Sequence, residues 1–247
     1  MLKKFDLPDF SHIQFDPTKH SYVANGAELT GVTRFLSQYQ KPFDQATMAA
    51  RVAERDGRPV ESVLAEWAAK GRASLALGTT VHEHIQSVLN NGAAVSDDPF
   101  LALNTKSDCP EIEAFGAFWA KAKTSMEPVA VEWVVGDDAA GVAGTIDCLM
   151  HSSKTGLLHL VDWKTGKFDT YNRFEFLLPP FDGENASKLN IYSLQLSAYR
   201  LILERAGVKL GESYIIHFSY AGAQTHKAVD YRPQLEKIFS DLEVPFS

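Results

Sequence analysis

Cysteine is scarce in this chain: 247 residues contain only Cys109 and Cys148, and the two do not form a CxxC pair. A disulfide framework is therefore excluded, and a four-thiolate zinc or iron–sulfur site cannot be assembled within one chain. Long apolar runs are absent as well, since none approaches the roughly 18–20 residues that a membrane-spanning helix needs. The N-terminus has two lysines but no apolar stretch of signal-peptide length, so we expect a cytoplasmic protein that does not contact a membrane.

The chain also lacks an excess of basic residues, because its formal net charge is −7. Proteins that coat nucleic acid through phosphate contacts are usually basic, so this chain could bind nucleic acid only through a local groove. Its hydrophobic content of 45% is ample for the core of one large domain, or of a core with an added subdomain.

Two common catalytic motifs are missing. The stretch KTGK at 164–167 is not a phosphate-binding P-loop, because Val161 stands where the first glycine is required and no Ser or Thr follows the second lysine. The triplet HEH at 82–84 is not a zinc-protease motif, because position 86 is a glutamine. An ATPase and a zinc protease are therefore excluded.

Apolar periodicity predicts an alternation of helices and strands. A hairpin with an Asn25–Gly26 turn is predicted within residues 13–36, leading into a short helix. Helices are predicted at 44–70 (a pair broken near Gly57–Pro59), 78–90, 110–124 and 188–206, with a short one at the C-terminus. Strands are predicted at 128–135, 142–150, 157–163, 213–219 and 224–230. This order predicts an α/β fold with a mixed central β-sheet flanked by helices.

Charged residues lie near the ends of two strands that are otherwise apolar. Asp147 lies in "GVAGTIDCLM" (141–150), and Asp162 and Lys164 lie in "LLHLVDWKTGK" (157–167). Residues i and i+2 of a strand share a face, and pairing of the two strands would bring Asp147 beside Asp162. Close carboxylates repel each other unless a cation lies between them, and Mg²⁺ accepts such oxygen ligands. With a lysine to activate water or stabilise phosphate charge, the set suits phosphodiester hydrolysis.

The same residues also permit a structural interpretation, in which Asp162 and Lys164 form a surface ion pair and Asp147 caps a turn. Three further residues bear on the choice. His82 opens a helix after a Gly-Thr-Thr lead, and Gln195 and Tyr199 share one face of the helix at 188–206 because they are four residues apart. Each of these could equally be a core or core-edge residue when taken alone.

Taken in order, "GTTVH" (78–82), Glu132, "GTID" (144–147), "VDWKTGK" (161–167) and "QLSAY" (195–199) resemble the RecB-like branch of the PD-(D/E)XK nuclease superfamily. The similarity is greatest to stand-alone phage exonucleases and the mitochondrial genome-maintenance exonuclease. It covers nearly the whole chain and is weakest after about residue 205. It implies one nuclease domain over 1–247, with an N-terminal hairpin and helical cap or arch at 1–77, a catalytic core at 78–230 and a C-terminal helix at 231–247.

The resemblance implies a role for each matching residue. His82, Asp147 and Asp162 correspond to metal ligands, together with the backbone carbonyl of Trp163, and Lys164 corresponds to the catalytic lysine. The cofactor implied is Mg²⁺, for which Mn²⁺ would substitute. An iron–sulfur cluster, present in several relatives, is not expected because the cysteines for it are missing.

Further residues are implied around this set. Glu132 corresponds to the acid on the first core strand, and Gln195 and Tyr199 correspond to a Q-x-x-x-Y helix that supports the site and contacts nucleic acid. Past the lysine, Tyr171 and Arg173 belong to an aromatic-rich loop that could stack single-stranded bases or simply pack on the sheet. The candidate arch carries interleaved basic residues: Lys41, Arg51, Arg55, Arg58, Lys70 and Arg72.

The expected function is therefore that of a metal-dependent deoxyribonuclease. The resemblance favours an exonuclease that acts on DNA ends or single-stranded DNA in phage-type replication, recombination or repair, in the host cytoplasm if phage-encoded. A recombination or replication protein is an expected partner class. Two alternatives stay open: a catalytically silent nuclease-fold protein that binds DNA, and a structure-specific endonuclease.

Overall fold

The strands form one mixed sheet in the computed structural model, which describes residues 5–90 and 109–242. Within these ranges the sheet has eight strands in the order β1-β2-β3-β5-β6-β7-β8, and β4 pairs with β5 outside this path. The strands are β1 (Ile13–Asp16), β2 (Ser21–Ala24), β3 (Ala27–Gly31), β4 (Met126–Asp137), β5 (Val142–Ser152), β6 (Leu158–Lys164), β7 (Leu210–Ser219) and β8 (Gly222–Lys227). The pairs β3–β5 and β6–β7 are parallel and the others are antiparallel.

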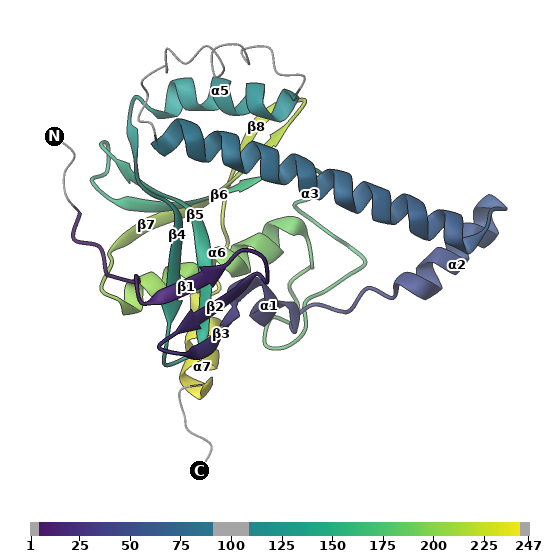
Figure 1. Cartoon of the computed structure of the whole chain (residues 1–247), viewed down its shortest axis with the longest axis horizontal. Helices are drawn as coiled ribbons and strands as arrows, with labels where there is room; N and C mark the ends of the chain where they lie inside the picture. Colours follow the sequence, from purple (N-terminus) through teal and green to yellow (C-terminus); the bar gives the residue numbers. More distant parts are fainter. Residues whose placement is uncertain (1–4, 91–108, 243–247) are drawn as a thin grey trace.

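Helices cover both faces of this sheet (Figure 1). They are α1 (Val32–Ser37), α2 (Gln45–Asp56), α3 (Val60–Asn90), α5 (Pro110–Ala122), α6 (Lys188–Arg205) and α7 (Arg232–Leu242). On one face, α3 and α5 bury an aromatic-rich core that includes Phe115, Trp119 and Trp163. On the other face, α1, α6 and α7 close a larger core around Leu194 and Phe239. The predicted fold class, a mixed sheet flanked by helices, is confirmed.

The N-terminal hairpin is a three-stranded meander. The predicted Asn25–Gly26 turn joins β2 to β3, and both residues have positive φ, 51° and 83°, as a tight Asn-Gly turn requires. The additional strand, β1, pairs with β2 ahead of that turn. In the described part of the chain, the meander pairs with the main sheet through two residues of β3, which lie opposite Val142 and Ala143 of β5.

The predicted boundary between two helices near residue 78 is wrong. The pair broken near Gly57–Pro59 is confirmed, since α2 ends at Asp56 with Gly57 in the left-handed region (φ 63°). Beyond it, however, α3 runs without interruption from Val60 to Asn90. The Gly-Thr-Thr lead before His82 was interpreted as a helix start, but the alanine-rich stretch before it has high helix propensity and carries the helix through Gly78. The proposed limit between cap and core, at 77/78, thus falls inside one helix.

The two ends of α3 have different surroundings. Val81, Ile85 and Leu89 are buried against the sheet, whereas every residue from Ala68 to Ala76 is exposed. At the far end, a small cluster of Ala49, Ala53 and Val63 holds α2 against α3. Figure 1 shows α3 and α2 projecting together from the body of the molecule. No helix of the described ranges is long and apolar enough to cross a membrane. Residues 243–247 of the predicted C-terminal helix lie outside the described residues.

Candidate active site

The central hairpin places Asp147 beside the end of β6. Strands β5 and β6 pair antiparallel with Cys148 opposite Val161, which confirms the pairing expected from the sequence. One step further along, Asp147 Oδ2 accepts a hydrogen bond from the backbone N–H of Trp163 at 2.8 Å. This bond fixes the Asp147 carboxylate beside the last residues of β6.

His82 reaches the same place from the buried half of α3. Its Nε2 lies 3.1 Å from the carbonyl oxygen of Trp163, a separation that requires Nε2 to carry the proton and donate it. The other nitrogen, Nδ1, lies 3.8 Å from Glu132 Oε1 and 3.9 Å from Asp147 Oδ2. In the neutral imidazole the Nδ1 lone pair therefore faces two carboxylates.

Glu132 lies on β4, opposite Asp147 of β5. The Val131–Cys148 and Trp133–Ile146 pairs on either side of it are in the same register, and its φ of +48° is uncommon for a residue with a side chain. Such backbone outliers cost on the order of 1–3 kcal/mol and cluster at functional sites. The sequence identified Glu132 only through the family pattern, because a local distortion of this kind has no signal in the apolar alternation.

The third carboxylate, Asp162, is paired with the lysine two residues on. Lys164 Nζ lies 2.6 Å from Asp162 Oδ2, as a shared strand face predicts. Asp162 is 2% exposed, and burial raises its pKa in spite of Lys164. Burial would lower the pKa of Lys164, but the charges of Asp162 and Asp147 outweigh it and raise that pKa above its ordinary value. The surface ion pair considered from the sequence is in fact a buried one.

Three of these side chains form a group that could hold a metal ion. One ligand atom each from His82, Glu132 and Asp147 lies within 4.8 Å of the others. Octahedral Mg²⁺ at its usual distance of about 2.1 Å places its ligands roughly 3–4.2 Å apart, so the 3.8 and 3.9 Å separations suit a divalent cation. The same neighbours act on His82: burial lowers its pKa, but the carboxylates of Glu132 and Asp147 produce a net rise.

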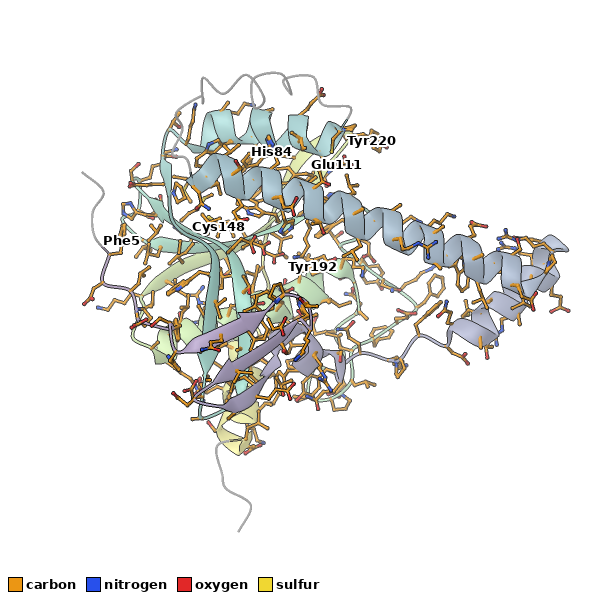
Figure 2. All side chains as sticks on the ribbon, in the orientation of Figure 1. Phe5, His84, Glu111, Cys148, Tyr192 and Tyr220 are labelled. Atoms are coloured by element: carbon orange, nitrogen blue, oxygen red, sulfur yellow. The ribbon has the colours of Figure 1, made fainter. Side chains whose placement is uncertain are left out.

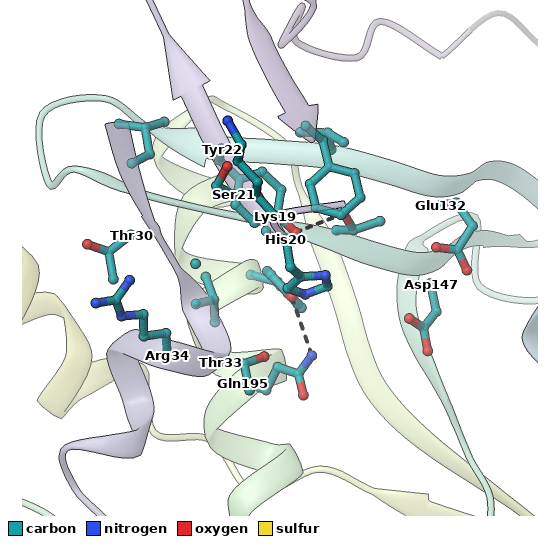
Figure 3. A pocket seen from close by; sticks show the side chains of 18 of the residues that line it. Lys19, His20, Ser21, Tyr22, Thr30, Thr33, Arg34, Glu132, Asp147 and Gln195 are labelled. Atoms are coloured by element: carbon teal, nitrogen blue, oxygen red, sulfur yellow. Dashed lines mark hydrogen bonds between the residues drawn. The ribbon is translucent and has the colours of Figure 1, made fainter. Parts of the chain in front are cut away.

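The Gln195–Tyr199 pair lies on α6 beneath these strands. Gln195 Nε2 donates to the Tyr199 hydroxyl at 3.3 Å, and Tyr199 is buried against Gly144. A Cβ at Gly144 would lie 2.6 Å from Tyr199 Cε1, so only glycine fits there. Both side chains line a cleft of about 750 Å³ that also contains Glu132 and Asp147 (Figure 3). The structure thus brings Gln195 and Tyr199 of α6 into one cleft with Glu132 and Asp147.

The loop after β6 divides into packed and exposed aromatics. Phe168 stacks between His217 and His226, with ring centroids 5.0 and 4.7 Å away. By contrast, Tyr171, Phe174 and Phe176 are exposed, and the Arg173 guanidinium lies 4.5 Å above the Phe174 ring. Tyr171 and Arg173 are therefore outside the buried site, on an exposed surface. In α2, α3 and their connection, acids neutralise several of the basic residues: Arg55 pairs with Asp56, and Arg58 and Lys70 pair with Glu66.

Tyr192 is a site residue that the sequence interpretation missed. The Lys164 ammonium lies 4.7 Å above its ring centroid, a cation–π distance, and the ring also stacks with Phe168. Figure 2 labels Tyr192 on α6, below α3. Its position three residues before Gln195 places both on one face of α6, which is a spacing that could have indicated it.

Comparison with protein families connects this geometry to a known group. The family model of the PD-(D/E)XK nuclease superfamily matches residues 58–243, about three quarters of the chain. The chain belongs to this superfamily. PD-(D/E)XK nucleases use divalent metals, and membership implies DNA as the substrate, so the protein is a nuclease with a group of side chains suited to such a metal. A search of curated proteins found no match.

Proposed function

We propose that this PD-(D/E)XK nuclease is a Mg²⁺-dependent deoxyribonuclease of the RecB-like branch, and that it acts as an exonuclease on DNA ends or single strands. Mn²⁺ would substitute for Mg²⁺. The observation that carries the proposal is the group formed by His82, Glu132 and Asp147, with the Asp162–Lys164 pair on the neighbouring strand β6. A role in phage-type replication, recombination or repair in the cytoplasm, with a replication or recombination protein as partner, is part of the proposal and rests on the resemblance.

Each residue has a distinct task in this proposal. His82 Nδ1, Glu132 and Asp147 would hold the cation, with Asp162 as a further ligand implied by the family pattern. The Trp163 carbonyl, which that pattern also implies, lies instead at the opposite ring nitrogen, 3.1 Å from His82 Nε2. When bound, a divalent cation supplies charge stabilisation for the phosphate and makes water a better nucleophile. The Trp163 N–H and carbonyl already orient two of the ligands, through Asp147 and His82.

Lys164 acts in this proposal as an electrostatic group. Because its pKa is raised, the ammonium keeps its proton at neutral pH, which argues against general-base catalysis by this side chain. A fixed positive charge stabilises the negative charge that develops on a phosphate during hydrolysis. The buried Asp162 and the Tyr192 ring hold that charge in position.

Two exposed elements support the end- or single-strand preference. The stretch of α3 from Ala68 to Ala76 is exposed, with α2 as its outer support. The exposed aromatics Tyr171, Phe174 and Phe176 belong to the loop that follows Lys164. Base–aromatic stacking contributes about 1–3 kcal/mol per base without sequence preference, as an exonuclease path for single strands needs.

Digestion of linear and circular DNA tests the proposal. Linear duplex, single-stranded linear and closed circular DNA, labelled at the 5′ or 3′ end, would be incubated with Mg²⁺, Mn²⁺ or EDTA. Asp147→Asn, which keeps an oxygen for the Trp163 N–H, should lower the rate by about 10³-fold or more. The matched control is Asp138→Asn, which changes an exposed carboxylate paired with His12.

Each of the following results would favour one alternative to the proposal or overturn it. Cleavage of closed circles at the rate of linear DNA would favour an endonuclease. Binding of DNA without turnover at saturating metal would favour a silent accessory protein. Equal activity of Asp147→Asn and the wild type would overturn the assignment of the site.

A further inference from the structure

The turn that follows Lys164 is held from the neighbouring strand by a buried histidine. His217 lies on β7, directly opposite Lys164 in the parallel pairing of β6 with β7. It is 7% exposed, and its Nε2 lies 2.8 Å from the carbonyl oxygen of Gly166. A carbonyl oxygen only accepts hydrogen bonds, so Nε2 must carry the proton and donate it. The bond therefore fixes a turn in which Gly166 has a φ of +73°, a value that glycine adopts readily.

The second nitrogen of this histidine is buried without a partner. His217 Nδ1 has no hydrogen-bond partner within residues 5–90 and 109–242, and the same is true of Nε2 of the neighbouring His226. Burial lowers the pKa of His226, which keeps that ring neutral at neutral pH. A buried nitrogen without a partner is unfavourable, so a phenylalanine or leucine at position 217 would fill the same space at a lower cost. The bond to Gly166 is what the imidazole offers beyond packing.

Stacked rings connect this histidine to the Lys164 ammonium. The Phe168 ring, two residues past the turn, stacks with His217 at a centroid distance of 5.0 Å and with His226 at 4.7 Å. It also stacks with Tyr192 of α6 at 6.1 Å. The Lys164 ammonium in turn lies 4.7 Å above the centroid of the Tyr192 ring. A shift of His217 would therefore pass through Phe168 to the ring that holds the ammonium.

We propose that His217 is a positioning residue for Lys164; the inference rests on the proposed nuclease function. Its bond to Gly166 fixes the turn, and the turn fixes the Phe168 and Tyr192 rings, so that the ammonium stays where it meets the phosphate. His217 is not a member of the metal-binding group and acts only through Lys164. A small misplacement of a charge that stabilises a transition state slows the reaction without weakening binding of the substrate. Loss of the bond should therefore lower the rate of cleavage and leave the affinity for DNA unchanged.

Three substitutions separate the hydrogen bond from the ring. His217→Gln keeps an N–H donor for Gly166, His217→Phe keeps the ring without the donor, and His217→Leu keeps neither. Single-turnover cleavage of linear DNA with Mg²⁺ should stay within about twofold of the wild type in the Gln variant and fall by about three- to tenfold in the Phe variant. The Leu variant should lose at least as much. DNA affinity, measured by fluorescence anisotropy with Ca²⁺ in place of Mg²⁺, should change by less than about twofold in all three.

Stability distinguishes positioning from a structural role. His217→Phe removes a buried nitrogen without a partner and keeps the stack on Phe168, so its urea unfolding should match that of the wild type. A loss of rate in this variant then has no cause in unfolding. The matched control is His151→Phe, which makes the same exchange beside Phe5. His151 pairs with Leu158 at the start of β6, at the other end of the strand from Lys164, and this control should keep the wild-type rate.

A measurement without substrate completes the test. In the NMR spectrum of the metal-free protein, the Tyr192 ring should shift the Lys164 side-chain protons upfield, because they lie over its face. This shift should persist in His217→Gln and shrink in His217→Phe. The proposal is overturned if His217→Phe cleaves at the wild-type rate, if the Gln variant is as slow as the Phe variant, or if the Lys164 shift is the same in both. Failure of the nuclease function is a separate outcome: the expected shifts without cleavage retain the positioning and reject the nuclease, whereas cleavage that is independent of His217 does the reverse.

Discussion

The two halves of α3 differ both in composition and in their surroundings. From Val81 to Leu89 the helix packs on the sheet, and it contributes His82 to the metal-binding group. From Ala68 to Ala76 it is exposed on all sides, and Leu75 is 73% exposed. The loop after β6 approaches α3 near the boundary of the two halves: a Cβ at Gly78 would be 3.7 Å from Thr165 Oγ1, and one at Gly166 would be 3.4 Å from Oγ of Ser74, within the exposed stretch.

The difference shows how one helix can join a rigid site to an exposed arm. The buried half is fixed by tertiary packing, which holds His82 to within hydrogen-bond distance of the Trp163 carbonyl. The exposed half depends on helix propensity and on the short contact with α2, because none of its residues from Ala68 to Ala76 is buried. Substitutions in the buried half of α3 should therefore change the rate of cleavage. Substitutions in the exposed half, or in the exposed loop after β6, should change the affinity for DNA.

The largest predicted effect is a difference in stability between variants of the buried and the exposed half of α3. Ile85→Ala removes a side chain that is 1% exposed and should lower the free energy of unfolding by about 2–5 kcal/mol, through lost burial and a residual cavity. Leu75→Ala, at 73% exposure, should change it by no more than about 0.5 kcal/mol. Urea unfolding followed by circular dichroism measures both. Similar losses in the two variants would show that the exposed half is packed in solution.

The exposed loop should influence DNA binding more than chemistry. Tyr171→Ala/Phe174→Ala removes two exposed rings and should weaken single-stranded DNA binding by about 1–3 kcal/mol per base that stacks. Single-turnover cleavage at saturating DNA should stay close to the wild-type rate. Tyr220→Ala is the matched control, since Tyr220 is 89% exposed on the β7–β8 turn, away from this loop. Equal weakening by the control would assign the effect to general surface change.

Much of the core could be predicted from the sequence because its strands have simple patterns. The apolar runs around Asp147 and Asp162 predicted β5 and β6, and the antiparallel pairing considered for them is present. The i+2 spacing of Asp162 and Lys164 predicted that the two side chains meet. These features depend on local periodicity, which a single sequence displays.

The rest depended on contacts between distant segments. The positive φ of Glu132 in β4 and the position of the Tyr192 ring beside Lys164 are properties of the folded chain. The continuity of α3 through Gly78 was hidden because a glycine followed by two threonines is typical of a helix start. Whether a loop aromatic is packed, like Phe168, or exposed, like Phe174, is likewise a property of the folded chain.

Metal affinity should depend on pH through His82, on the buried half of α3. The metal needs the neutral imidazole, and the net rise of the His82 pKa above 6.5 means that the metal-free site holds a proton to higher pH than an ordinary histidine does. Affinity for Mn²⁺ should therefore fall as pH decreases through that raised pKa, by about tenfold per pH unit below it. Calorimetry in buffers of different ionisation enthalpy would detect the released proton. His82→Gln should flatten the dependence, and an unchanged slope would rule out His82 as its source.

The smallest effect concerns how Tyr192 holds the catalytic lysine. The Lys164 ammonium lies 4.7 Å above the ring, and Lys188 approaches the same ring at 5.9 Å. Tyr192→Leu removes the ring and should slow single-turnover cleavage. The expected rise in activation free energy is about 0.5–2 kcal/mol, which is the range of a cation–π contact. Tyr192→Phe keeps the ring and should stay within about twofold of the wild type, while Lys188→Gln controls for the second cation. If the Phe and Leu variants lose the same rate, the hydroxyl and not the ring positions Lys164. If neither variant is slower than the wild type, the buried Asp162 alone fixes the Lys164 ammonium, and the Tyr192 ring only packs against it.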